Sequence, residues 1–552
     1  MPEPGTQADV GELLRRIREI EARLARLEQR FEPAPSASAP RAEPAQIALI
    51  ESVAAVPILG RAVLAMAGAY VLRAFTEAHM VAPKAGVFAA IGYAVFWLVW
   101  AARIPAGRRA ETALYSLTSA LVLGPLIWEA TLRLHAVSTW TSAAVLLAFT
   151  SIGLLISWRK NLLIVATISI LTAVLTGAAL LIGSHDVVPF LLLLVLIAAA
   201  VEISACLDHW LSERWLAAAA ADLVVLLATY LASDPRGLPE SYAPIPYFFV
   251  LGAQLALPAI YLSSTVVRTF LRGSTIRMFE VAQLAIVFLL VLGGAPRLGG
   301  PSILPAISVF CLGSAAVCYA TGAALKGRNF QVYLGFAFLL TLAAVRIALP
   351  AGWAAAVTSA LALGCMMLPR PAFRWQGAGY LLFALGSSGA LAQSTRGLLD
   401  GHDPTDSLLP LLGEAAIALA CFILAARGPS PSVLRMALAA AAFWPLAALG
   451  AAAIAGSYHA IFGSLASHSY CAAGRTAVLA GGAVLLAWIG SRQTAFEITP
   501  LVYPLMILGA YRLLLVDLRQ DSKAALVISL LVYGSALLLV PRFMRPRQTT
   551  SS

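Results

Sequence analysis

Long apolar runs separated by short polar segments fill most of this chain. Many of them approach 20 residues, the length that a helix needs to cross the hydrocarbon core of a bilayer. The pattern predicts about eighteen membrane spans, near residues 58–75, 85–102, 112–131, 140–158, 162–182, 188–206, 216–232, 247–267, 278–294, 302–325, 330–350, 352–368, 377–393, 407–426, 436–456, 476–490, 501–516 and 524–541. The predicted fold is therefore all-α, a polytopic helical bundle integral to a membrane.

A different periodicity precedes the first span. Apolar residues there step alternately by three and four, which is the heptad pattern of a coiled coil. The seam consists of Val10, Leu13, Ile17, Ile20, Leu24, Leu27 and Phe31. The arginines at g positions face glutamates at e positions of a parallel partner, so the pattern predicts a parallel homo-oligomer. An amphipathic helix lying on the bilayer remains the alternative.

These patterns divide the chain into four segments. They are a cytoplasmic coiled-coil helix (1–32), a Pro/Ala-rich linker (33–46), a multi-span transmembrane domain (47–545) and a cytoplasmic tail (546–552). The first 45 residues lack the basic start, short apolar core and cleavage site of a signal peptide. We therefore expect the first span to act as an uncleaved anchor.

Composition agrees with this class and sets an orientation. Hydrophobic residues make up 60% of the chain and charged residues only 12%, and the mean hydropathy is +0.85, whereas charged residues reach about 25% in soluble domains. With the amino terminus in the cytoplasm, 27 of the 38 lysines and arginines fall on the cytoplasmic side. Cytoplasmic loops carry this excess, so both termini are predicted to be cytoplasmic. The net charge of +11 follows from the same bias and predicts no nucleic-acid partner.

Polar residues inside the predicted spans are the candidate site residues, because burying an ionisable group in a bilayer costs about 2.5–3.5 kcal/mol on insertion scales. The candidate intramembrane polar site consists of Glu129, Gln254, Arg346, Glu414, Arg512 and Asp517. Three further acids lie toward the inner side: Glu202, Asp222 and Glu280. Pro125 and Pro258 remove backbone donors near Glu129 and Gln254, as in the broken helices of transporter sites. Structural ion pairs and simple helix kinks are the alternative readings.

The carboxy-terminal stretch LMILGAYRLLLVDLRQDSKAALVISLLVYGSALLLVPRF has a basic residue, an Asp-Leu, a polar turn and a final Ser- and Gly-containing helix. Arg512 and Asp517 carry this pattern. Together with the heptad helix, the linker and the sequence LGRAVLAMAGAYVLRAFTEAHMVAPKAGVFAAIGYAVF, it resembles a bacterial family of predicted membrane proteins, domain of unknown function 2339. The resemblance covers the two ends of the chain. It implies a bacterial inner-membrane location and no known activity.

No motif of a soluble enzyme is present: we find no P-loop, HExxH pattern, dinucleotide fingerprint or GxSxG elbow. No cofactor and no metal site are predicted, and five of the six cysteines lie in apolar runs without CxxC spacing. Three function classes remain open. The first is a transporter or flippase for an envelope precursor or small solute. The second is a scaffold that recruits partners through its coiled coil, and the third is a transferase with an extracytoplasmic site that uses carboxylates such as Glu77 or Asp403.

Overall fold

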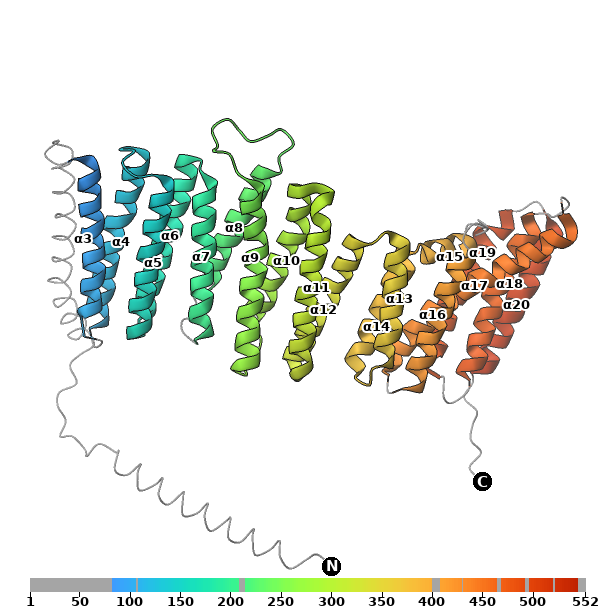
Figure 1. Ribbon diagram of the computed structural model, residues 1–552. Coiled ribbons are helices and arrows are strands. Elements are labelled where there is room, and N and C mark those ends of the chain that lie inside the picture. The colour runs from blue at the N-terminus through green and yellow to red at the C-terminus, as the bar shows by residue number, and fades with distance from the viewer. Residues whose placement is uncertain are drawn as a thin grey trace, which may run out of the picture. The chain divides into compact units, whose positions relative to one another are not determined.

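The computed structural model describes residues 82–105, 108–207, 214–399, 408–428, 430–463, 468–491, 496–519 and 522–544. The predicted coiled coil, linker, first span and carboxy-terminal tail lie outside these ranges, as do Glu77 and Asp403. Within them, every regular element is a helix (Figure 1). The all-α prediction is thereby confirmed for the described part of the chain.

The chain divides into two compact units, residues 1–130 and 131–552. The helices begin with α3 (Pro83–Arg103), α4 (Arg109–Leu132), α5 (Thr139–Lys160), α6 (Leu163–Ser184), α7 (Val187–Cys206), α8 (Arg214–Ala232), α9 (Tyr247–Val266), the π-helix η1 (Val267–Leu271) and α10 (Met278–Gly299). They continue with the 3-10 helix η2 (Gly300–Ile303), α11 (Leu304–Ala324), α12 (Gly327–Ala348), α13 (Ala351–Met367), α14 (Pro371–Ser387), α15 (Ala390–Leu399) and α16 (Leu408–Arg427). The last are α17 (Ser432–Phe462), α18 (His468–Gly490), η5 (Phe496–Leu501), α19 (Val502–Leu515), η6 (Asp517–Arg519) and α20 (Lys523–Met544).

Fourteen helical segments of the described residues are long and apolar enough to cross a membrane. One of them, Met278–Ala324, is 47 residues long and contains both α10 and α11. The helix α13 contains only 17 residues and is not among them, whereas α19 is part of the 22-residue segment Ile498–Arg519, which is. These segments are those of an integral membrane protein, and the count of about eighteen spans stays a prediction.

The predicted span 377–393 does not form one helix. The helix α14 ends at Ser387 and the ten-residue α15 begins at Ala390. Gly389 between them has a φ of +76°, a left-handed conformation that ends a helix and that glycine adopts without strain. The two prolines expected to interrupt spans behave differently, since α4 and α9 remain continuous through Pro125 and Pro258.

Helix exteriors and interiors have different compositions, as expected of a protein surrounded by lipid. Large apolar side chains are widely exposed, with Leu409 at 84% and Leu538 at 79% exposure. The buried positions are rich in alanine, serine and threonine. Small residues let membrane helices approach closely, because lipid leaves packing and interhelical hydrogen bonds to hold them together.

In the first unit, α3 and α4 form an antiparallel pair. The Ser119 hydroxyl donates to the Ala94 carbonyl at 2.6 Å. The Trp97 and Tyr115 rings stack with their centroids 5.3 Å apart. These contacts join the two helices near their middle and near the connecting turn.

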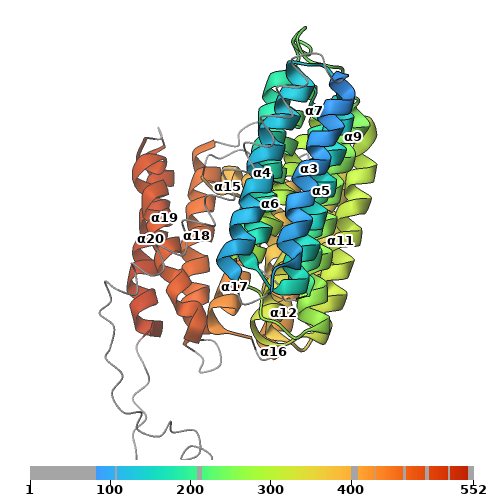
Figure 2. The same ribbon diagram turned by 90° about the vertical axis from the view of Figure 1, so that its left-hand side faces the viewer.

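The second unit contains consecutive antiparallel helices. Neighbours in sequence pack together throughout, and α7, α8, α9 and α10 additionally form a four-helix group in which α7 contacts α9 and α8 contacts α10. A second group joins α18, α19 and α20, which run side by side in Figure 2. The four-helix group is the element that positions the candidate site.

Candidate functional site

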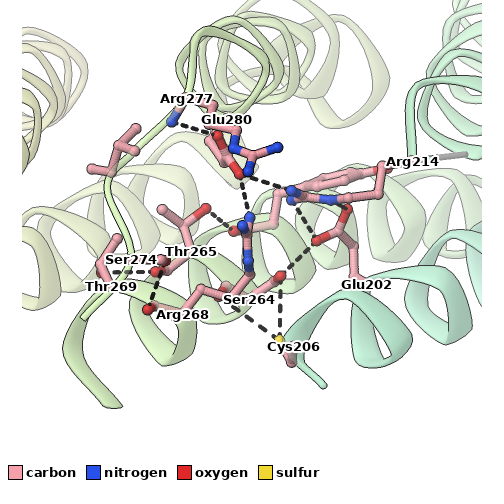
Figure 3. A network of polar contacts seen from close by, with 12 residues as sticks. Glu202, Cys206, Arg214, Ser264, Thr265, Arg268, Thr269, Ser274, Arg277 and Glu280 are labelled. Atoms are coloured by element: carbon pink, nitrogen blue, oxygen red, sulfur yellow. Dashed lines mark hydrogen bonds and ion pairs between the residues drawn. The ribbon is translucent and has the colours of Figure 1, made fainter. Parts of the chain in front are cut away.

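Four charged side chains meet between α7, α8, η1 and α10, and we call them the ionic network: Glu202, Arg214, Arg268 and Glu280 (Figure 3). Each is only 2% or 3% exposed. The helix pairs α7–α8 and α9–α10 turn at the same end of the group, so the end of one helix and the start of the next bring these residues together. Residues 66 positions apart in sequence thus come into contact.

Every carboxylate oxygen of the ionic network accepts at least one hydrogen bond. The Arg214 guanidinium donates through Nε and Nη2 to the two Glu202 oxygens, both at 2.8 Å, and through Nη1 to Glu280 Oε1 at 2.7 Å. Arg268 Nη1 also donates to Glu280 Oε1. The remaining Glu280 oxygen accepts from the backbone N–H of Arg277 at 2.7 Å, and Ser264 donates to Glu202 Oε2 at 2.5 Å. The fork of Arg214 therefore holds both acids at once.

Electrostatics explain why this arrangement tolerates burial. Two carboxylates face two guanidinium groups, so their formal charges cancel. An unpaired charge is the costly case in a low-dielectric interior, whereas a neutral cluster whose carboxylate oxygens are all hydrogen-bonded recovers much of the desolvation penalty. The Arg214 guanidinium also lies over the Phe279 ring, 4.8 Å from its centroid. The network joins α7, α8, η1 and α10 rather than adding large net stability.

The π-helix η1 positions Arg268. Its wider turn is closed by Ser274, whose backbone N–H and hydroxyl both donate to the Arg268 carbonyl, at 3.1 and 2.8 Å. The Thr269 hydroxyl is hydrogen-bonded to Tyr333 on α12 at 2.8 Å. Single π-helical turns inside α-helices are frequently found at functional sites. Here the turn carries the second cation of the ionic network.

Polar side chains continue along the interior of α8, α9 and α10, and we call them the polar column: Thr229, Gln254, Tyr261, Asp222 and Gln283. Gln283 donates to Asp222 Oδ2 at 2.8 Å, and Gln254 donates to Thr229 Oγ1 at 2.6 Å. Tyr261 follows Gln254 by seven residues on α9 and is 2% exposed. The column therefore joins three helices through pairs of side chains.

The spacing of these residues explains their alignment. Gln254, Tyr261 and Arg268 follow each other at intervals of seven residues, and so do Asp222 and Thr229. Seven residues make nearly two helical turns, so such residues share one helix face about 10 Å apart. Along the helix axis, Arg268 and Gln254 are therefore about 21 Å apart. This is roughly two-thirds of the thickness of a bilayer's hydrocarbon core, which is about 30 Å.

Three buried atoms along this path have no hydrogen-bond partner within the described part of the chain: Asp222 Oδ1, Gln254 Oε1 and Arg268 Nε. Buried polar atoms are nearly always paired, so unpaired ones call for a reason. No protein-family model, curated protein or solved structure matches the chain. The chemistry of the site therefore rests on its own geometry, which contains hydrogen-bond donors, acceptors and the Asp222 carboxylate.

The same residues do not indicate metal binding. Among the residues that the structure describes, no three His, Cys, Asp or Glu side chains are close enough to hold a metal ion. Arg214 and Arg268 already occupy the Glu202 and Glu280 oxygens that face them. The ionic network and the polar column can bury charged groups and form hydrogen bonds.

The structure separates the other predicted site residues from this group. Glu414 on α16 accepts a hydrogen bond from Ser359 on α13 at 3.0 Å and is 7% exposed. Glu129 is half-buried on α4, and Arg346 is exposed near the end of α12. Of the predicted residues, the three inner acids and Gln254 share the four-helix group of α7, α8, α9 and α10.

Arg512, a predicted intramembrane residue, lies inside the helix packing. Its side chain is fully buried, and Nη1 donates to the carbonyls of Leu398 and Leu399 at the end of α15, the latter at 2.9 Å. Asp517 is 2% exposed and accepts from Thr476 on α18 at 2.7 Å. Arg512 and Asp517 are thus both buried between packed helices.

Sequence reasoning missed several of the residues that complete the site. Arg214 and Arg268 lie just outside the predicted spans 216–232 and 247–267, and Gln283 and Tyr261 are not among the predicted site residues. The seven-residue spacing of polar residues on α9 was a usable signal, because it places them on one face. The pairing of Arg214 with acids on two other helices had no such local signal.

A glycine pair on α10 allows a matched test of the column. A Cβ at Gly294 would overlap Gln254 Nε2 and lie 3.0 Å from Thr229 Cγ2, whereas a Cβ at Gly293 meets nothing within 4 Å. Both substitutions add the same helix propensity, so their difference isolates the clash. We expect Gly294→Ala to lower stability by about 1–3 kcal/mol relative to Gly293→Ala.

The measurement is the thermal unfolding midpoint of both variants and the wild type in lipid nanodiscs. Equal midpoints for the two alanine variants would show that Gln254 moves aside without cost and that the column is loosely packed.

Proposed function

We propose that this protein is a membrane transporter for a small polar solute and that α7, α8, α9 and α10 form its translocation unit. The observation that carries the proposal is the polar column, which continues from the ionic network between four otherwise apolar helices. A membrane protein keeps such costly groups where they line a substrate or ion path. Structural pairing alone accounts for the ionic network, but not for the unpaired oxygens of Asp222 and Gln254.

The burial of the polar column favours a small solute over a large lipid-linked precursor. Three members of the column are almost entirely buried, with Gln254 1%, Tyr261 2% and Gln283 4% exposed, and Asp222 is half-buried. Binding sites between membrane helices typically combine apolar walls with a few placed polar groups. A guest matched to Gln254 and Tyr261 needs both hydrogen-bond donors and acceptors.

The membrane, the number of spans and the orientation of the chain are also part of the proposal. We place the protein in a bacterial inner membrane with about eighteen spans and both termini in the cytoplasm, on the basis of the charge bias and the resemblance to domain of unknown function 2339. In this orientation the ionic network lies toward the cytoplasm. We further propose that residues 1–32 form a parallel coiled coil that joins copies of the chain.

Gln254→Met is the variant that tests the transport proposal. The protein would be extracted with its surrounding native lipid, and the retained small molecules identified by mass spectrometry. We expect one enriched solute in the wild type that is lost in the variant, because methionine keeps the side-chain volume and removes both polar groups. Gln331→Met on the exposed face of α12 is the matched control and should retain the solute.

The opposite results have definite meanings. Bulk lipid alone in the wild type, with a protein partner retained only when residues 1–32 are present, would favour a scaffold. Retention of the solute in Gln254→Met would remove the column from the transport path.

A further inference from the structure

Asp222 differs from the other acids of the four-helix group. Within α7, α8, α9 and α10, the sequence contains three carboxylates: Glu202, Asp222 and Glu280. The two glutamates are neutralised by Arg214 and Arg268. Asp222 instead accepts its hydrogen bond from the neutral amide of Gln283. It is the carboxylate in these helices whose charge no ion pair in the described residues offsets.

Its two oxygens have separate roles. Oδ2 accepts the Gln283 amide at 2.8 Å, while Oδ1 is buried and has no partner in the described part of the chain. Gln283 can donate to Oδ2 whether the acid is ionised or neutral, because a protonated carboxyl keeps an acceptor oxygen. A proton fits at Oδ1 without breaking any contact that the structure shows.

The helices packed against α8 carry these other polar and ionisable groups. Glu202 and Cys206 lie on α7, Tyr261 on α9, and Glu280 and Gln283 on α10; α8 itself contributes Arg214, and η1 contributes Arg268. The helix α6 also contacts α8 and has no ionisable residue between Leu163 and Ser184. The ionic network adds no net charge to these surroundings.

We propose that Asp222 is the proton-binding site of this protein and that the polar column exchanges that proton with one side of the membrane. The inference rests on the proposed transport function and supplies its coupling ion. In the step, a hydronium ion transfers its proton to Asp222 Oδ1 and leaves as water, the carboxylate becomes a neutral carboxylic acid, and the reverse step returns the proton to water. No oxidant, reductant or other reactant takes part.

The free oxygen of Gln254 supports a path rather than an isolated acid. Gln254 lies one heptad along α9 from Tyr261, toward Thr229, and its Oε1 is a buried acceptor without a partner in the described residues. Together, Asp222 Oδ1 and Gln254 Oε1 offer two acceptor positions along the group. Acidic side chains inside membrane helices commonly belong to proton relays.

The test is infrared spectroscopy of the full-length protein in liposomes, titrated with acid. Protonation of Asp222 should produce the carbonyl stretch of a carboxylic acid, and Asp222→Asn should lose that band. Glu240→Gln, in the exposed loop before α9, is the control and should keep it. Asp222→Glu should retain a titrating band, because it keeps the acid.

A second measurement needs no substitution, so it stands even if Asp222→Asn does not fold. Labelling aspartate side chains of the wild type with carbon-13 should shift the titrating band, whereas labelling glutamate should leave it unchanged. An unshifted band, or a band of unchanged intensity in folded Asp222→Asn, would overturn the inference. The transport proposal fails on separate grounds, when the wild type retains no solute, so the two failures are distinguishable.

Discussion

Arg214→Met is expected to destabilise the protein by about 3–5 kcal/mol, which is the cost of removing one partner from a buried ion pair. Arg214 makes three hydrogen bonds to Glu202 and Glu280 across α7, α8 and α10. Methionine fills similar volume but leaves Glu202 with only the Ser264 hydroxyl among its observed partners. The measurement is the thermal unfolding midpoint in lipid nanodiscs.

Arg236→Met provides the control, because Arg236 is exposed in the loop between α8 and α9 and should change stability by less than about 0.5 kcal/mol. The double variant Arg214→Met with Glu202→Gln tests the mechanism. Glu202→Gln removes the carboxylate charge that Arg214→Met leaves unpaired. The double variant should therefore lose less stability than the sum of the losses in the two single variants, with a coupling energy of about 0.5–3 kcal/mol. Additive effects would show that the two side chains are energetically independent.

Arg512→Leu is expected to cost about 2 kcal/mol or more, because hydrogen bonds from a charged donor contribute roughly 1.5–3 kcal/mol. The Arg512 guanidinium donates to two carbonyls at the end of α15, where the helix dipole also favours a cation. Leucine leaves those carbonyls without this donor. We therefore expect the backbone amides of Ala390–Leu399 to exchange hydrogen faster with solvent.

Hydrogen exchange followed by mass spectrometry measures this effect directly. Arg519→Leu is the matched control, since Arg519 is exposed in η6 and should leave exchange in α15 unchanged. Unchanged protection of α15 in Arg512→Leu would contradict the assigned role. A uniform loss of protection throughout the second unit would indicate global unfolding instead of release of α15.

Apolar run length was a good guide to helix position. The span predicted at 85–102 is α3, Pro83–Arg103, and the span predicted at 524–541 lies within α20, Lys523–Met544. In a bilayer an apolar segment has to satisfy its own backbone hydrogen bonds, which the helix does locally. Local sequence therefore decides the element. The span predicted at 377–393 failed because the chain turns at Gly389, where apolar content gives no signal.

The sequence by itself also singled out Glu202, Asp222, Glu280 and Gln254 as costly residues, because cost depends on residue type and membrane depth. Only the tertiary structure decided which of these charges are neutralised. Arg214 and Arg268 pair with the two glutamates, Asp222 receives a neutral amide, and Arg512 binds carbonyls 113 and 114 residues earlier. These partners lie on different helices. Their choice depends on which helix faces pack together, and no local pattern specifies that.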